Sequence, residues 1–222
     1  MNETLNDFLY KYFDNLLLKP PLFYSWHYSI RFEIAKPGSE HEDKQNMKQI
    51  QERSRTLFDT VFEDEDELLF VSNIHCEKAN HFLQKRPANI YRKYVKDKNR
   101  RMQLTHSVLP SLIWDADEDD YDTMVTHQFV LACSKQGIAY ADLLLAISHN
   151  DFAHPRRILK NNIKDGYDIF FVNVPKKMIY HLYDDRGCDI IAVNIEDLRE
   201  LYEKYNDWIL DYDRERIDLL FT

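Results

Sequence analysis

The chain has 222 residues, 44% of them hydrophobic and 14% aromatic, with a formal net charge of −9. This composition excludes an intrinsically disordered chain, and the negative charge disfavours non-specific adhesion to nucleic acid or anionic lipid. Four glycines argue against glycine-rich phosphate loops, and three widely spaced cysteines make no disulfide framework. We therefore expect a folded protein of the cytoplasm.

The first third of the chain predicts two helices and two strands. Hydrophobic residues recur at helical spacing from Leu5 to Leu16, ahead of Pro20-Pro21, and alternate with polar ones from Tyr28 to Ile34. A stripe from Met47 to Val61 predicts a long helix, and the apolar run 67–74 predicts a central strand. The N-terminus lacks the features of a signal peptide, and no run is long enough to span a membrane.

The middle of the chain predicts two strands and a short helix. The strands are expected at 102–110 and 123–133, joined by an acidic loop at 115–122. A short apolar helix is expected at 138–147.

The last third has the clearest pattern. Segments 168–174, 177–183 and 188–193 are separated by short turns, which favours an antiparallel meander. Asn194 is expected to cap a helix that carries Leu198, Leu201, Tyr202, Tyr205, Trp208 and Ile209 on one side. We predict one α+β domain spanning 1–222. It has a mostly antiparallel sheet, a C-terminal three-stranded meander, and N-terminal, central and C-terminal amphipathic helices.

The segment YDDRGCD has two interpretations. As a turn, Asp184 accepts hydrogen bonds from backbone amides, Gly187 supplies a positive φ, and Arg186 pairs with Asp189 on the surface. As the site of a hydrolase or nucleotide-processing enzyme, Asp184 and Asp185 share a proton or hold a cation, Arg186 clamps an anion, and His181 assists. Because adjacent residues of an extended segment point to opposite faces, we favour the turn and leave the catalytic alternative open.

The chain has two acidic runs, Glu63–Glu67 and Asp115–Asp122. They have two interpretations: they are solvated loops, or they form a docking surface for a basic partner. The second run resembles a calcium loop, but its sixth position is Asp120 and its twelfth is Thr126, so we expect no metal. The candidate partner-binding residues combine these acids with two aromatic anchors: Glu63, Asp64, Glu65, Asp66, Trp114, Asp115, Asp117, Asp119, Asp120 and Tyr121.

Other signals are weaker. The basic segment 78–101, with Phe82, Tyr91 and Tyr94, could bind single-stranded nucleic acid or form the outer face of a helix with its aromatics turned inward. His75, Cys76 and His81 lack the spacing of a zinc site, Cys188 has no evident base, and no cofactor motif occurs.

Three stretches, PLFYSWHYSIRFEI, YDDRGCDII and LYEKYNDWILDYDRERID, resemble in that order a family of Bacillus-type bacterial proteins, the domain-of-unknown-function family 3885. The resemblance spans nearly the whole chain. It implies a bacterial protein with one compact domain and implies no particular activity.

Small acidic proteins of this kind often act as immunity proteins, which neutralise a cationic toxin domain. By this analogy we expect a non-enzymatic binding protein with a basic protein partner, without cofactor, nucleic acid or membrane. The sequence does not set the oligomeric state.

Overall fold

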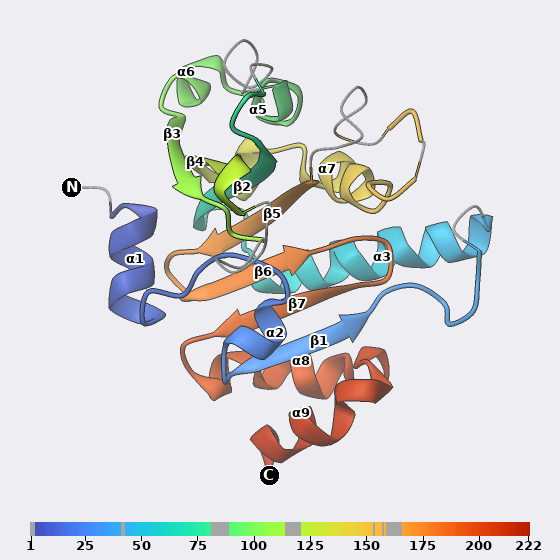
Figure 1. Ribbon diagram of the computed structural model, residues 1–222. Coiled ribbons are helices and arrows are strands. Elements are labelled where there is room, and N and C mark those ends of the chain that lie inside the picture. Colours follow the sequence, from blue (N-terminus) through green and yellow to red (C-terminus); the bar gives the residue numbers. More distant parts are fainter. Residues whose placement is uncertain are drawn as a thin grey trace.

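The fold is built around one seven-stranded antiparallel sheet (Figure 1). The computed structural model describes residues 3–40, 43–80, 89–113, 121–152, 154–156, 158 and 166–222. In chain order the strands are β1 Ser29–Glu33, β2 Glu67–Glu77, β3 Thr105–Pro110, β4 Met124–Ser134, β5 Gly166–Asn173, β6 Met178–Leu182 and β7 Gly187–Ala192. Across the sheet they run β1-β7-β6-β5-β2-β4-β3. The predicted α+β class and the antiparallel meander β5-β6-β7 are confirmed.

Helices lie on both faces and at the ends of this sheet (Figure 1). In chain order they are α1 Leu5–Tyr12, α2 Leu22–Ser25, α3 Lys44–Val61, α5 Asn89–Tyr94, α6 Lys98–Arg101, α7 Tyr140–Ile147, α8 Arg199–Lys204 and α9 Arg214–Phe221. Short 3-10 turns occupy Tyr121–Thr123, Lys135–Gly137, Ile195–Leu198, Asn206–Trp208 and Asp211–Asp213.

Two hydrophobic clusters, one on each face, hold the helices to the sheet. On one face α3, α5, α7 and α8 cover a large aromatic core in which Phe58 packs edge-on against Phe171 and Tyr180. On the other face α1 packs Phe8 and Leu9 against Val71, Phe170 and their neighbours. Strand β2 is buried at every position from Leu68 to Cys76 because both of its faces are covered, as its nearly continuous apolar run predicted.

Local sequence signals set the ends of the helices. At α1, Thr4 and Asp7 cap each other reciprocally, and at α3 the Asp43 carboxylate accepts from the amides of Gln45 and Asn46 at 2.7 and 2.9 Å. Helix α1 ends at Tyr12, earlier than predicted, because Asp14 and Asn15 adopt positive φ.

The segment from Phe13 to Trp26, which includes the short helix α2, crosses the α1 face of the sheet, and buried polar side chains bind its backbone. The amide of Asn73 donates to the Leu18 carbonyl at 2.7 Å, and the hydroxyl of Ser29 donates to the Phe23 carbonyl at 2.9 Å. The Leu18 carbonyl lies outside any helix or strand, and the Phe23 carbonyl belongs to the single turn of α2, so neither has a partner within a longer helix or a sheet.

Two local predictions are wrong. Strand β1 was expected to be half-buried, yet Ser29 is fully buried and the Arg31 side chain is only 12% exposed. The reason is that Phe23 and Tyr24 of α2 lie over the Arg31 guanidinium, and Asp213 lies 3.5 Å from it. Asn194 makes no side-chain bond to the backbone; its amide donates to Asp197 at 3.3 Å, and the predicted helix is divided into two 3-10 turns around α8.

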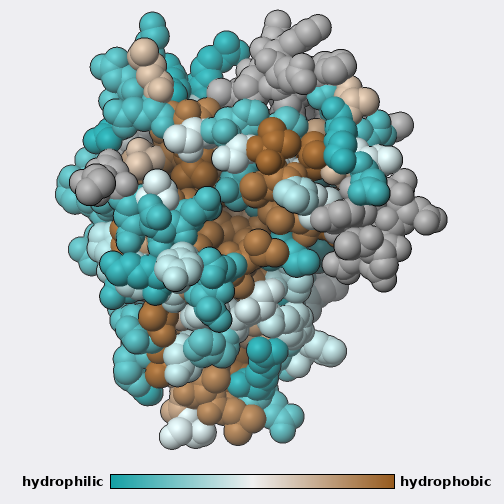
Figure 2. Space-filling model, turned by 60° about the vertical axis from the view of Figure 1, so that its left-hand side comes forward, coloured by the Kyte–Doolittle hydropathy of each residue, from teal (hydrophilic) through white to brown (hydrophobic). Residues whose placement is uncertain are grey.

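The face shown in Figure 2 is mainly hydrophilic. On the side shown in Figure 2, hydrophobic residues gather near the middle of the face with hydrophilic residues around them. The large apolar side chains that remain exposed include Leu17, Met102 and Val108. None of the helices in the described part of the chain combines the length and hydrophobicity needed to cross a membrane.

Candidate functional site

The Asp-Asp-Arg-Gly corner is a tight turn between β6 and β7. One oxygen of Asp184 accepts the amide of Arg186 at 2.7 Å, and the other accepts the guanidinium Nε of the same residue at 2.7 Å. Asp184 and Asp185 are buried, whereas the Arg186 side chain is 74% exposed. The predicted role of Asp184 in shaping the turn is therefore right.

Two details of the predicted turn are wrong. Gly187 does not have a positive φ; it is needed because an added Cβ would meet the Tyr183 hydroxyl and would lie 2.5 Å from the carbonyl oxygen of Phe32. Asp189 is not a surface partner of Arg186. It is fully buried in β7, where Arg31 of the neighbouring β1 donates to it at 2.8 and 3.2 Å.

The turn lines a cleft of about 920 Å³ at the end of the sheet. The cleft is also lined by Pro20 and Pro21 of the crossing segment, by the chain from Ala35 to Ser39, and by the start of β5 at Gly166–Asp168. The carboxylates of Asp184 and Asp185 thus belong to a concave surface.

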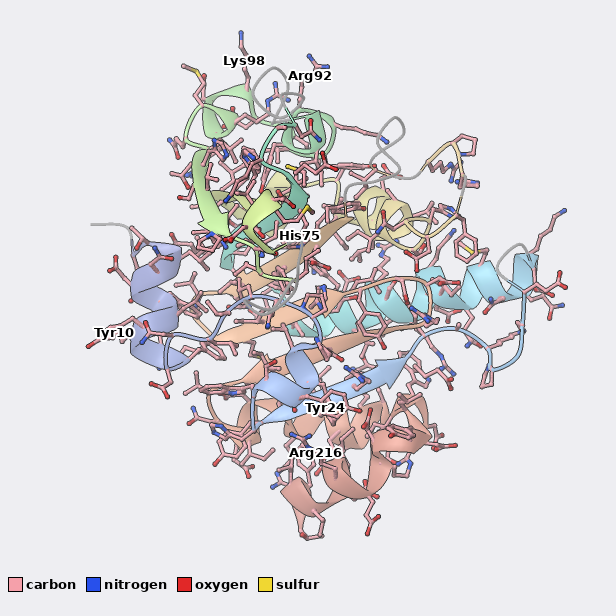
Figure 3. All side chains as sticks on the ribbon, viewed as in Figure 1. Tyr10, Tyr24, His75, Arg92, Lys98 and Arg216 are labelled. Atoms are coloured by element: carbon pink, nitrogen blue, oxygen red, sulfur yellow. The ribbon has the colours of Figure 1, made fainter. Side chains whose placement is uncertain are left out.

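A hydrogen-bonded group of three residues from three neighbouring strands lies at this cleft. The Asp168 carboxylate accepts from Nε2 of His75 at 2.8 Å, and Nδ1 of His75 lies 2.9 Å from the hydroxyl of Thr126. His75 is inside the molecule (Figure 3), and Thr126 is fully buried. Of the three, Asp168 has the most exposed side chain, at 15%.

Two further buried polar side chains near Asp168 have no hydrogen-bond partner among the described residues. Both ring nitrogens of His181 lack one, although its Nε2 lies 3.7 Å from Asp168; its ring stacks on Phe170. The hydroxyl of Tyr167 lacks one as well, but Tyr167 packs in the aromatic core on the opposite face of β5. His181 is therefore the unpaired polar group on the same face as Asp168, and leaving such a group unpaired is costly.

The electrostatics of the group favour a charged carboxylate. Burial raises the pKa of Asp168, but the imidazoles of His181 and His75 outweigh burial and lower this pKa to about 2. Asp168 is therefore an anion at neutral pH.

The hydroxyl–imidazole–carboxylate order resembles a catalytic triad, but Thr126 is poorly placed as a nucleophile. Its side chain is fully buried, and its oxygen already accepts the amide of Leu112 at 3.1 Å. A nucleophile must be reachable by substrate. Within the described residues no cluster of three or more His, Cys, Asp or Glu is arranged to hold a metal ion.

The cleft is lined by more carboxylates than cations. The carboxylates are Glu33, Asp151, Asp168, Asp184 and Asp185, and the cations are Arg31, Lys36 and Arg186. Two of the cations are already in ion pairs: Arg31 with Asp189, which does not line the cleft, and Arg186 with Asp184, which is one of the five carboxylates. The cleft therefore favours a cationic ligand over an anionic one.

The predicted acidic docking residues are only partly described. In the first run, Glu63 and Asp66 lie 3.0 and 3.9 Å from the ammonium of Lys176, and Asp66 also accepts from Asn173 at 2.7 Å. Asp64 lies 3.8 Å from Lys135, and the side chains of Glu63 and Asp64 are 76% and 66% exposed.

The rest of the predicted docking surface lies outside the described residues. This applies to Trp114, Asp115, Asp117, Asp119 and Asp120, and to the side chain of Tyr121.

The basic segment turns its described aromatics inward. Tyr91 is fully buried, with hydrogen bonds to Ser72 and to two main-chain carbonyls, and Tyr94 is 3% exposed. Arg92 and Lys98 reach outward (Figure 3). Neither tyrosine is available to stack on a base.

The three cysteines are buried, and none of them forms a disulfide bond within the described residues. Burial raises the pKa of Cys133 to about 12 and that of Cys188 further still, so neither is a thiolate nucleophile at neutral pH.

The hydrogen-bonded group of His75, Asp168 and Thr126 was not predicted from the sequence. The local pattern places His75 near Cys76 and His81 and does not connect it with Asp168, because that pairing depends on β2 lying next to β5. The sequence does carry one signal: His75 and Asp168 are each a titratable residue within a mostly apolar strand.

Comparisons with known proteins place the chain in a family. The family described as "Domain of unknown function (DUF3885)" matches residues 5–213. The chain is 30% identical over 205 residues to "Uncharacterized protein YnaE" of Bacillus subtilis (strain 168), covering 90% of this chain and 94% of that protein. No solved structure matches significantly. The match over nearly all of the sequence shows that this bacterial protein belongs to the DUF3885 family.

Proposed function

We propose that this protein is a non-enzymatic binding protein of the cytoplasm that takes up a basic protein partner, in the manner of an immunity protein. The observation that carries the proposal is the charge of the cleft. Its carboxylates outnumber its cations, and Arg31 and Arg186 are held by carboxylates of the protein itself. A basic partner brings the complementary charge.

The acidic runs support the same partner. The net charge of −9 attracts a basic protein over a distance, and Glu63 and Asp64 present exposed carboxylates. In this proposal Asp115, Asp117, Asp119 and Asp120, with Trp114 and Tyr121, extend the docking surface.

A salt-dependent association rate tests the proposal. The partner is isolated with tagged protein from the source bacterium, purified, and its association is measured from 50 to 500 mM salt. These concentrations cover a several-fold change in the screening length, so we expect the rate to fall steeply. The triple variant D117K/D119K/D120K should slow association and leave dissociation almost unchanged.

A matched control separates local from total charge. The variant E203K/D207K/E215K changes the net charge by the same amount at exposed positions in the C-terminal region. It should slow association much less. If both triple variants slow association equally, or neither does, the acidic run at 115–122 is not the docking surface. If the isolated partner is not basic, the proposal is wrong.

A second candidate, a hydrolase or nucleotide-processing enzyme, is favoured by one observation: the Asp184–Arg186 turn lines a cleft that also holds Asp168 and His75. The cleft carboxylates repel phosphate, which weakens this candidate. Release of phosphate from nucleotides by the purified protein, lost in Asp168→Asn, would support the enzyme and contradict the binding protein.

A further inference from the structure

We propose that the edge strand β3 is a self-association surface, which pairs antiparallel with β3 of a second copy of this chain and joins the two sheets. The proposal does not rest on the proposed function, because it concerns main-chain pairing at the edge of the sheet and a different partner.

The two edge strands of the sheet differ in whether the rest of the chain covers them. At β1, the amide of Leu210 donates to the Arg31 carbonyl at 3.1 Å, and Ile209 forms an antiparallel bridge with Phe32. At β3, none of the described residues forms a bridge or a main-chain hydrogen bond on the outer side (Figure 1). Every second residue of an edge strand turns its amide and carbonyl outward, so β3 presents a row of such groups to another strand.

Strand β3 lacks the side chains that usually protect an exposed edge. Residues 102–113 contain no Asp, Glu, Lys or Arg, although 30% of the whole chain is charged. Edge strands commonly carry a lysine or an internal proline, whereas Pro110 is the last residue of β3. Three large apolar side chains of this stretch are exposed, Met102 at 79%, Val108 at 57% and Ile113 at 45%. An uncharged and partly apolar edge is typical of an association surface.

The α1 face of the sheet leaves β3 accessible. A groove of about 450 Å³ lies between the start of α1 and the last two strands. Thr105 and Ser107 of β3 line this groove together with Gln128 and Val130 of β4. Thr105 and Ser107 are themselves exposed, so α1 leaves this part of the sheet open to a neighbouring strand.

The charges at the two ends of β3 favour a second copy in antiparallel orientation. Helix α6 carries three cations and directly precedes β3 in the chain. At the opposite end of the strand, Glu77, Lys78 and Asp122 are exposed and together carry one negative charge. Antiparallel pairing places the cations of each copy beside the acidic end of the other copy. A basic partner would instead be repelled by α6 and would find no acidic residue on β3.

Two-fold symmetry limits the register of the pair. Each face of the joined sheet stays continuous when the two-fold axis is perpendicular to the sheet, so the axis passes through one residue near the middle of β3. With the axis at Ser107, Val108 lies opposite His106 of the other copy; with the axis at Val108, it lies opposite its own equivalent. Because the strand has six residues, the interface is small, and the dimer should depend on concentration.

Sedimentation velocity of the whole protein tests the proposal. We expect the 26.8 kDa monomer to convert to a species of twice this mass as the concentration rises from about 5 to about 500 µM. Val108→Lys places an ammonium in the interface and should weaken the dimer at least about tenfold. Ser107→Lys, also at an exposed position, serves if Val108→Lys fails to fold.

A matched control separates the edge strand from net charge. Leu219→Lys makes the same change in charge at an apolar side chain of α9 that is 70% exposed, and it should dimerise as the wild type does. Hydrogen exchange followed by mass spectrometry then locates the contact. The amides of β3 should exchange more slowly at the concentrations that give the dimer, and this protection should be absent in Val108→Lys.

The outcomes decide both the surface and its occupant. A monomer over the whole concentration range contradicts the proposal. A dimer that the β3 variants leave unchanged, or β3 amides whose exchange is independent of concentration, places the contact elsewhere and also contradicts it. Protection of β3 only after the isolated basic partner is added would assign the edge to a strand of that partner and overturn the assignment to a second copy.

Discussion

Arg31 of β1 and Asp189 of β7 form a bidentate ion pair at the edge of the sheet, with Nε–Oδ1 at 2.8 Å and NH2–Oδ2 at 3.2 Å. The Asp189 side chain is completely buried, and it also accepts the backbone amide of Phe23 at 3.0 Å. Asp213, near the C-terminus, lies 3.5 Å from the same guanidinium. One buried carboxylate therefore connects β7 to β1 and to the start of α2, and Arg31 extends the connection to the C-terminal region.

Removing this carboxylate should destabilise the fold strongly. Asp189→Ala leaves the Arg31 guanidinium, only 12% exposed, without its main partner, and we expect a loss of about 3–5 kcal/mol in the free energy of unfolding. Urea unfolding followed by circular dichroism measures it. The control Asp211→Ala removes a carboxylate that is 97% exposed and pairs with Arg214. It should leave the urea midpoint nearly unchanged; equal losses in both variants would contradict the importance of the buried pair.

Gly187 should not tolerate even one added methyl group. In Gly187→Ala the new Cβ would lie 2.5 Å from the Phe32 carbonyl oxygen, which is main chain and cannot move aside easily. We expect a destabilisation of about 1–3 kcal/mol by overpacking. Gly137→Ala is the matched control, because the nearest atom would be Ser134 Oγ at an ordinary 3.6 Å. A thermal melt in which the two variants coincide would contradict this account of Gly187.

Because of Asp168, the free energy of unfolding should decrease at low pH. Its pKa falls from an ordinary value of 3.8 to about 2 in the folded protein, so the unfolded chain binds the proton more readily. The stabilisation is therefore fully present above about pH 4 and is lost as the pH falls towards 2, and it amounts to about 2 kcal/mol. We expect the difference in unfolding free energy between wild type and Asp168→Asn to shrink over this range. A difference independent of pH would show that the carboxylate is not held ionised.

The paired histidines of β3 and β4 should resist protonation. Nε2 of His106 lies 2.9 Å from Nδ1 of His127, so one nitrogen donates and the other must keep its lone pair. Burial lowers the pKa of both residues below 6.5, and at His127 the neighbouring His106 lowers it further. Because both folded pKa values are depressed, this contribution to stability is present above pH 6.5 and is lost on acidification.

NMR titration of the ring protons tests the histidine pair. The midpoint of His127 should lie below 6.5 and should rise in His106→Gln, which removes the charged neighbour. A midpoint above 6.5 in the wild type, or one unmoved by the substitution, would contradict the pairing.

The helices and strands that the sequence predicts well are those whose defining residues lie close together in the chain. Strands β5, β6 and β7 follow one another with short turns, and Asp184 shapes its turn through the amide of Arg186 two residues on. Helix α3 was predicted because Ile50, Leu57 and Phe58 recur at helical spacing, and the structure buries all three.

The candidate site was not predictable in the same way. His75 and Asp168 are 93 residues apart, and Arg31 and Asp189 are 158 apart. Their contact depends on the order of the strands across the sheet, which no local pattern encodes. Asp189 was assigned to a surface pair with Arg186 for this reason: the nearest cation in sequence is not the nearest in space.

The pairing of β1 with β7 has a consequence for synthesis of the chain. Ser29 is aligned with Ile191, so β1 has no neighbouring strand until β7 has left the ribosome. Until then Ile30 and Phe32, both fully buried in the finished protein, stay open to water and to chaperones. Because the loop between β1 and β7 is long, its closure is slow and delays the pairing of the two strands. We therefore expect folding to finish only after translation has passed β7.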